Sequence, residues 1–161
     1  MDDEIDYGDA SKYINDESIE MAWAVKAAER ANVHINLLMS CNTESLKLNN
    51  RQEQIQQAFR EDFPNLDVKN VTEVELKQGE MREKWRQFCE KFKDVEDYSL
   101  GTLMRMDAAQ AYSEKNSIVV PKTNVFQIIW LAIESTRNAE GLNERLKPSI
   151  AEDHKQNSAQ L

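Results

Sequence analysis

Six charged residues stand among apolar neighbours, and they are the positions in this chain where side chains are best placed for polar chemistry. They are Glu20, Arg86, Arg105, Asp107, Glu134 and Arg137. Opposite charges in such settings form Arg–carboxylate pairs, whose two-pronged geometry ties one element of structure to another. Two interpretations follow: a structural polar network that holds helices to a neighbouring strand, or a polar patch that a partner recognises. We assign to the structural network the residues Glu20, Arg86, Arg105, Asp107 and Glu134.

An indole among charges marks the long apolar segment near the C-terminus. On a helical wheel, Trp130 projects with the polar side of this segment, flanked by Phe126 and Ile133. A second layer of structure, such as a hairpin, could cover Trp130. Alternatively, Trp130 is an anchor for a protein partner, because Trp and Arg are over-represented among interface hot spots. The candidate partner-binding residues on this second interpretation are Phe126, Trp130 and Arg137.

Motifs of known catalytic or cofactor chemistry do not occur in the sequence. There is no phosphate-binding glycine loop, no H-E-x-x-H, no C-x-x-C and no G-x-S-x-G. Cys41 and Cys89 are too few and too far apart for a disulfide framework or a zinc site, and His34 reads as a residue at the edge of the core. We therefore expect no catalytic residue, no metal, no cofactor and no enzymatic activity.

The charge of the chain is concentrated at its N-terminus. The net charge is −9 with a pI near 4.8, and residues 1–17 hold seven acids against Lys12 alone, which is −6 of that total. This balance argues against direct nucleic-acid binding and predicts a mobile acidic arm over residues 1–15. Without a secretory signal or a membrane-length apolar run, the chain is expected to be cytoplasmic, with the nucleus possible.

Helices dominate the first two thirds of the chain. A stripe at helical spacing predicts a helix over residues 18–40, with the inward positions Met21, Ala24, Ala28, Ala31, Ile35 and Leu38. A shorter helix spans residues 50–63 and ends at Pro64. Thr72 and Glu75 form a capping box, and the helix that they start breaks near Gly79. The next helix, residues 80–93, has an inward face made of Met81, Trp85, Phe88, Cys89 and Phe92.

Two short strands and a long helix complete the pattern. Residues 100–106 and 118–120 predict an antiparallel pair joined by a long loop, and a helix then runs from about residue 124 to Leu146, where Pro148 ends it. The expected fold is α+β, mainly α: a bundle of four to five helices with a small two-stranded antiparallel element before the long C-terminal helix. An all-α fold is the alternative. One globular domain, residues 16–147, would be followed by a polar C-terminal tail over residues 148–161.

Several blocks of the sequence resemble the eukaryotic family called polysaccharide-biosynthesis-domain-containing protein. They are Ile19–Ala24, Lys84–Cys89, Gly101–Asp107 and Ile133–Asn143. Their order and spacing fit the family over about residues 16–146. Gln87 stands where a proline is expected and Ser135-Thr136 where Ile-Ala is expected, and the long charged C-terminal extension of animal members is not present.

The resemblance implies a dedicated, non-enzymatic chaperone of translation elongation factor one-alpha. Such a protein engages the GTP-binding domain of the newly made factor at the ribosome, with the nascent-polypeptide-associated complex, and releases it when GTP stabilises the client. No direct nucleic acid or membrane partner is implied, and a monomer is expected. The family label also leaves a methyltransferase or a sugar-modifying enzyme as an alternative, and a general cytosolic adaptor is a third. The resemblance assigns no client-binding residues.

Overall fold

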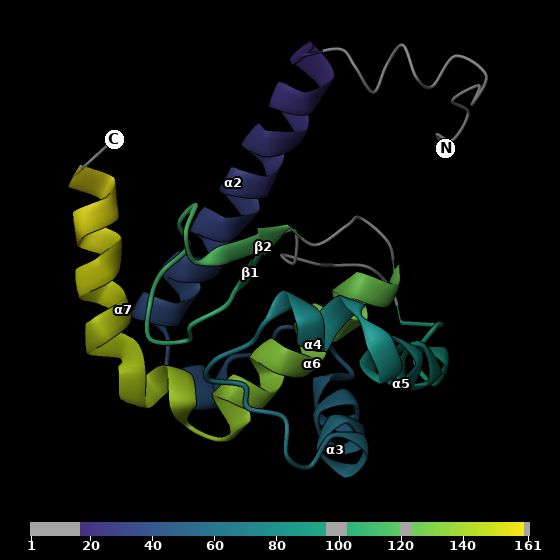
Figure 1. Cartoon of the computed structure of the whole chain (residues 1–161). Coiled ribbons are helices and arrows are strands. Elements are labelled where there is room, and N and C mark those ends of the chain that lie inside the picture. The colour runs from purple at the N-terminus through teal and green to yellow at the C-terminus, as the bar shows by residue number, and fades with distance from the viewer. Residues whose placement is uncertain (1–16, 96–102, 120–123, 160–161) are drawn as a thin grey trace.

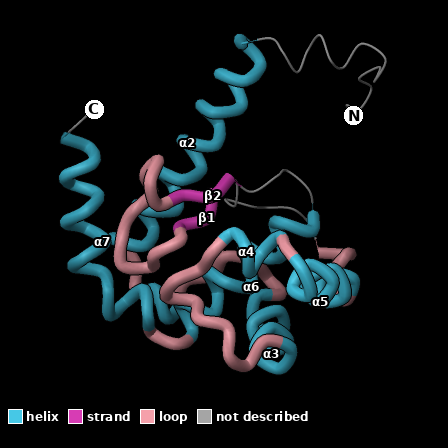
Figure 2. The backbone as a smooth tube through the Cα atoms, in the orientation of Figure 1, coloured by secondary structure: helices cyan, strands magenta, loops and turns pink. Residues whose placement is uncertain are grey.

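The computed structural model describes residues 17–95, 103–119 and 124–159, and the side chains of 25–95, 103–118 and 127–157. The described part contains six α-helices, one short 3-10 helix and one two-stranded sheet (Figures 1 and 2). In chain order they are α2 (Glu17–Ser40), η1 (Thr43–Ser45), α3 (Gln52–Asp62), α4 (Glu73–Lys77), α5 (Gly79–Glu90), β1 (Leu103–Arg105), β2 (Ser117–Val119), α6 (Asn124–Ala139) and α7 (Leu142–Ala159).

Helix α6 is the centre of the fold. It contacts α3, α5, α7 and η1, and every residue from 127 to 138 is buried. A surface helix buries one stripe and leaves the opposite face in water. Over residues 127–138, helix α6 is instead covered on all sides, so the polar residues of this stretch lie inside the protein as well.

An aromatic layer joins α3 to α5 on one side of α6. Phe63 stacks on Trp85 with ring centroids 4.3 Å apart, and Phe59 and Phe88 complete the cluster. The Trp85 indole donates to the backbone carbonyl of Glu75 in α4 at 3.0 Å. The capping box of Thr72 and Glu75 and the break at Gly79, where φ is +62°, are both present as predicted. The inward face predicted for α5 is confirmed, with Met81 half-buried at its edge.

The hairpin covers another side of α6. Strands β1 and β2 pair antiparallel, with Met104 opposite Ile118. The pair is widened by a bridge between Asn70 and Asp107, so the segment before α4 joins the same layer. The predicted antiparallel pair is thus confirmed, and the fold is α+β, mainly α, rather than all-α.

Helix α2 confirms the first predicted helix and reaches well beyond the body (Figure 1). Ala31, Ile35 and Leu38 are buried as predicted, whereas Ala28 is exposed and Ala27 takes its place. The side chains of Met21 and Ala24 lie outside the described residues, as does the predicted acidic arm.

The C-terminal segment differs from the prediction. Helix α6 ends at Ala139, and Gly141, with φ of +76°, lets the chain turn into a separate helix, α7. Pro148 lies inside α7 and does not end it, so the expected polar tail from residue 148 is helical up to Ala159.

Contacts with the body explain why α7 continues past its proline. Ile150 is fully buried beside Ile35 and Leu38 of α2. Asp153 accepts a hydrogen bond from the backbone amide of Ala111, in the hairpin loop, at 2.9 Å. A proline inside a helix costs about 3 kcal/mol, and these contacts offset that cost.

Replacing Ile150 with alanine tests this docking of α7. Because the side chain is completely buried, the substitution should lower the free energy of unfolding by about 2–5 kcal/mol. Urea unfolding measures the change, with Lys155→Ala on the exposed side of the same helix as the control, which should change little. Equal effects of the two substitutions would mean that the segment does not pack on α2.

Candidate functional site

A buried carboxylate between two guanidinium groups lies in the middle of the fold. Glu134 of α6 accepts from Arg105 Nη2 through Oε1 and from Arg137 Nη1 through Oε2, each at 3.0 Å. All three side chains are completely buried. Arg105 comes from β1, so the network fixes the hairpin against α6.

Backbone carbonyls receive most of the remaining guanidinium donors. Arg137 donates to the carbonyl of Val68 at 2.7 Å and to that of Arg105 at 2.8 Å. Arg105 donates to the carbonyl of Ala108 at 2.9 Å. The network therefore holds three segments in one arrangement: α6, the hairpin with its loop, and the strand-like segment before α4.

Glu134 stays ionised in this setting. Burial acts to raise the pKa of its carboxyl, but the charges of Arg105 and Arg137 outweigh burial and hold the pKa well below its usual range. A buried charge persists only where it is paired and hydrogen-bonded, and Glu134 meets both conditions.

His34 of α2 packs beside this network. Its Nδ1 lies 2.7 Å from the Tyr112 hydroxyl, and its ring meets that of Trp130 edge-on, with centroids 4.9 Å apart. The ring is completely buried, so the sequence-based placement at the edge of the core underestimates its burial. Burial lowers the pKa of His34 to about 4; the nearby Glu134 charge raises it and the Arg105 charge lowers it. His34 is accordingly neutral in the folded protein at pH 7.

The residues predicted to form one structural polar network do not all meet in the structure. Arg105 and Glu134 meet, as described above. Asp107 makes its own contact at the edge of the hairpin, accepting from Lys69 at 2.8 Å. Arg86 is exposed on α5 and pairs with Glu83 of the same helix, so it does not belong to the network. The side chain of Glu20 lies outside the described residues.

The predicted partner-binding residues need a correction. Trp130 is 1% exposed and donates its indole N–H to the carbonyl of Leu103 in β1 at 3.0 Å, so the hairpin covers it. Arg137 is completely buried. Neither side chain reaches the surface of this fold, because the polar side of α6 faces the hairpin and not solvent. The side chain of Phe126 is not among those described.

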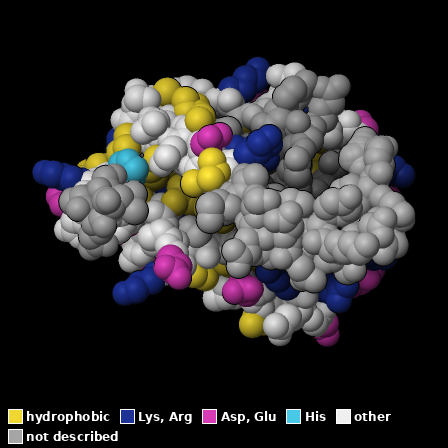
Figure 3. Space-filling model, turned by 90° about the horizontal axis from the view of Figure 1, so that it is seen from above, with side chains coloured by type: hydrophobic (Ala, Val, Ile, Leu, Met, Phe, Trp, Pro, Cys, Tyr) yellow, Lys and Arg dark blue, Asp and Glu magenta, His cyan; other side chains and the backbone are white. Residues whose placement is uncertain are grey.

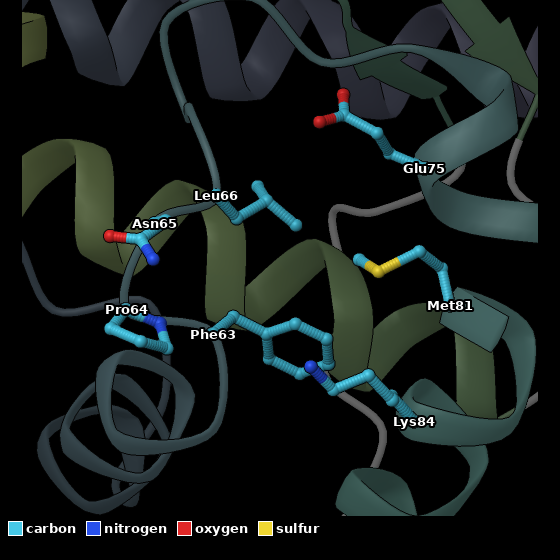
Figure 4. Close-up of a pocket in the computed structure, with 7 residues that line it drawn as sticks. All are labelled: Phe63, Pro64, Asn65, Leu66, Glu75, Met81 and Lys84. Carbon is cyan, nitrogen blue, oxygen red and sulfur yellow. The ribbon is translucent and has the colours of Figure 1, made fainter.

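A surface groove of about 340 Å³ lies where the turn after α3 faces α4 and α5. Its lining residues are Phe63, Pro64, Asn65, Leu66, Glu75, Met81 and Lys84. In the close-up of Figure 4, Leu66 and Met81 face each other across the groove, and Lys84 reaches along the Phe63 ring. The Lys84 ammonium lies 5.4 Å from the centre of that ring.

The composition of this groove suits part of a polypeptide. Phe63 and Leu66 are buried and form an apolar floor, while half-buried Met81 offers a side chain that adapts to different shapes. Glu75 and Lys84 provide charges of opposite sign. An apolar side chain with polar or charged neighbours would match this surface. Helical spacing alone places Met81 on a core face, because the groove forms only when three segments meet.

Other surface features carry less information. Val25 and Val33 of α2 are each about half exposed, and scattered apolar residues of this kind are ordinary on protein surfaces. On the described part of the face in Figure 3, hydrophobic side chains gather together and charges of both signs are interspersed. Among the described residues, no three potential metal ligands come together and no helix is long and apolar enough to cross a bilayer.

Comparison with known proteins gives a match over most of the chain. The family model described as PBDC1 protein matches residues 19–148. Protein PBDC1 of Mus musculus is 45% identical over 139 residues, which is 86% of this chain and 68% of the mouse protein. Protein PBDC1 of Homo sapiens is 42% identical over 142 residues, which is 88% of this chain and 59% of the human protein.

A solved structure shares the fold. The solution NMR structure of protein yst0336 from Saccharomyces cerevisiae aligns with a TM-score of 0.68 at 36% sequence identity. The alignment covers 82% of this chain and 90% of the yeast chain. The backbone fold of this chain is thus similar to one already observed by experiment.

Replacing Glu134 with glutamine tests the buried network. The change leaves two buried guanidinium groups without a counter-charge, and breaking a buried pair in this way costs about 3–5 kcal/mol. Urea unfolding of Glu134→Gln should show that loss. The control is Glu83→Gln, which removes an exposed partner of Arg86 and should leave stability close to that of the original protein. Similar midpoints for both variants would contradict the central role of Glu134.

Stability should also depend on pH through His34. In the unfolded chain its pKa is near 6.5, and in the fold about 4, so as pH falls below about 6.5 the unfolded state takes up a proton that the folded state does not. Between pH 7.5 and pH 5 this difference amounts to about 2 kcal/mol of lost stability. His34→Phe should lose less stability than the original protein over that interval, as measured by urea unfolding at both values. A pH dependence unchanged by the substitution would refute the assignment.

Proposed function

The chain belongs to the PBDC1 family, and we propose that it is a non-enzymatic chaperone of newly made translation elongation factor one-alpha. The single observation that carries the proposal is the family match over residues 19–148, a range that includes all four of the sequence blocks. The client segment would be the GTP-binding domain, met at the ribosome with the nascent-polypeptide-associated complex. The protein would act in the cytoplasm, with the nucleus possible.

A chaperone of this kind works by preferring one state of its client. It must bind the incompletely folded GTP-binding domain more tightly than the finished, nucleotide-loaded one. By linkage, GTP then weakens chaperone binding by the same factor by which the chaperone weakens GTP binding. Release needs no bond to be made or broken, so the mechanism requires a recognition surface and not a catalytic group.

The groove beside α5 is the surface that we propose for the client. Its apolar floor at Phe63 and Leu66 and the adaptable Met81 fit apolar side chains that an unfinished domain still exposes. Folding of the client would bury those side chains and remove them from the groove. Because GTP favours the folded state, the groove would lose its ligand when the nucleotide binds.

Co-purification from translating extracts tests the proposal. The tagged chain should bring down ribosome-bound elongation factor one-alpha whose GTP-binding domain has emerged, and added GTP should reduce the amount recovered. Absence of the factor both with and without GTP would overturn the function.

A charge reversal on α5 tests the groove itself. Lys84→Glu changes a groove-lining residue and should reduce recovery of the nascent factor several-fold. Arg82→Glu makes the same charge change on an exposed position of the same helix, outside the groove, and is the matched control. Equal loss in the two variants would indicate a general charge effect and would exclude the groove as the contact surface.

A further inference from the structure

A second hollow, of about 140 Å³, lies where η1, the first half of α3 and the end of α6 meet. Its lining residues are Glu44, Gln52, Glu53, Gln56, Ser135, Asn138 and Ala139. Six of these seven residues are of polar type, whereas four of the seven residues around the groove beside α5 are apolar. Ser135 and Asn138 are 3% exposed and form the buried part, whereas Glu44 and Glu53 are exposed at the rim.

The orientation of the Asn138 amide is imposed by the buried network. Arg105 can only donate, and its Nη2 lies 3.0 Å from Asn143 Oδ1. Asn143 therefore turns its Nδ2 toward Asn138 and donates to Asn138 Oδ1 at 2.7 Å. A chain of donors thus begins at a guanidinium group in the core and ends at Asn138 Oδ1, so the unpaired end of this amide is Nδ2.

Asn138 Nδ2 has no hydrogen-bond partner among the described residues, although the side chain is almost completely buried. A buried donor without an acceptor costs about 1–3 kcal/mol. Since Asn138 lines the hollow, a ligand there that carries an acceptor oxygen would remove this cost. Rotating the Asn138 amide by 180° would not satisfy this donor, because it would place the Asn138 nitrogen against the Asn143 nitrogen.

The charge around the hollow selects a cation. Glu44 and Glu53 form no ion pair with any described residue. The carbonyl end of α6 lies at the same place, and the helix dipole favours positive charge there. An anion would be repelled. A metal ion would need oxygen ligands, but Asn138 presents a nitrogen donor. A simple polyamine would leave that donor without an acceptor.

The required ligand therefore carries a positive charge next to an acceptor oxygen. A hollow of about 140 Å³ is smaller than the sites that hold whole small molecules, which are about 300–1,000 Å³. One side chain with its peptide group is of a suitable size. We propose that the hollow binds a lysine or arginine of an extended segment of a partner protein. The backbone carbonyl of that residue accepts from Asn138 Nδ2, and both rim carboxylates, Glu44 and Glu53, attract its cationic end.

This site adds a binding requirement to the proposed function. It rests on that function in one respect only, namely that the partner is a protein. In the proposed chaperone, the groove beside α5 would hold apolar side chains of the client. The hollow would add a requirement for a basic residue, and so would contribute specificity that an apolar surface alone does not give.

Peptide titration by NMR tests the inference on the full chain. The probe is acetyl-Ala-Lys-Ala-amide, and the control peptide has norleucine in place of lysine. The lysine peptide should shift the Asn138 side-chain NH₂ signals, with a dissociation constant on the order of 1 mM. Glu53→Gln should weaken this binding about two- to five-fold. Glu61→Gln, an equal change at an exposed position of the same helix outside the hollow, should leave it unchanged.

Each other result contradicts the site. Unchanged Asn138 signals would mean that the lysine peptide does not bind in the hollow. Equal shifts with the norleucine peptide would exclude recognition of the charge, and equal weakening by Glu61→Gln would indicate a non-specific attraction. Recovery of elongation factor one-alpha without a peptide response would defeat this inference alone. A peptide response without recovery of that factor would support the hollow and defeat the proposed function alone.

Discussion

The salt bridge of Glu134 with Arg105 and Arg137 is the interaction on which the arrangement of this protein depends. Replacing a buried ion pair with apolar residues is often neutral for stability, so its presence is poorly explained as a source of stability alone. Its contribution here is to favour a single arrangement of the hairpin on α6. The guanidinium donors must meet the Glu134 carboxylate and the carbonyls of Val68 and Ala108 together, and a shifted hairpin would leave buried charges unpaired. The network therefore specifies one register of the hairpin on α6.

The same network sets the chemistry of its surroundings. It orders the amides of Asn143 and Asn138, so the polarity of a surface hollow is determined by a charge in the core. The network also lies beside His34. The buried ring of His34 is neutral, and its Nδ1 forms a hydrogen bond with the uncharged Tyr112 hydroxyl. A substitution in the core can thus change binding at the surface without altering any surface residue.

Local sequence signals predicted most elements of this fold. The capping box at Thr72, the break at Gly79 and the two strands each depend on neighbouring residues, and each is present. Predictions that required knowledge of distant contacts were less successful. The helical wheel assumed that α6 has a solvent side and so placed Trp130 outward, whereas the hairpin covers that side. Pro148 indicated a helix end, but burial of Ile150 against α2 outweighs it. Neither the groove nor the hollow could be predicted, because each forms only where three separate elements pack together, within residues 63–84 for the groove and between residues 44 and 139 for the hollow.

Helix α3 connects the two surface features. Its first half lines the acidic hollow, and the turn that follows its last residue lines the apolar groove. Eleven helical residues span about 16 Å, a distance that about five residues of extended chain can cover. Helix α3 is held against α6 by Ile55 and Phe59, which are fully buried. The spacing between the proposed site for a cation and the proposed site for an apolar side chain is therefore fixed by the core. A rigid spacing of this kind favours partner segments in which a basic residue and an apolar one are separated to match, and it disfavours segments that have only one of the two.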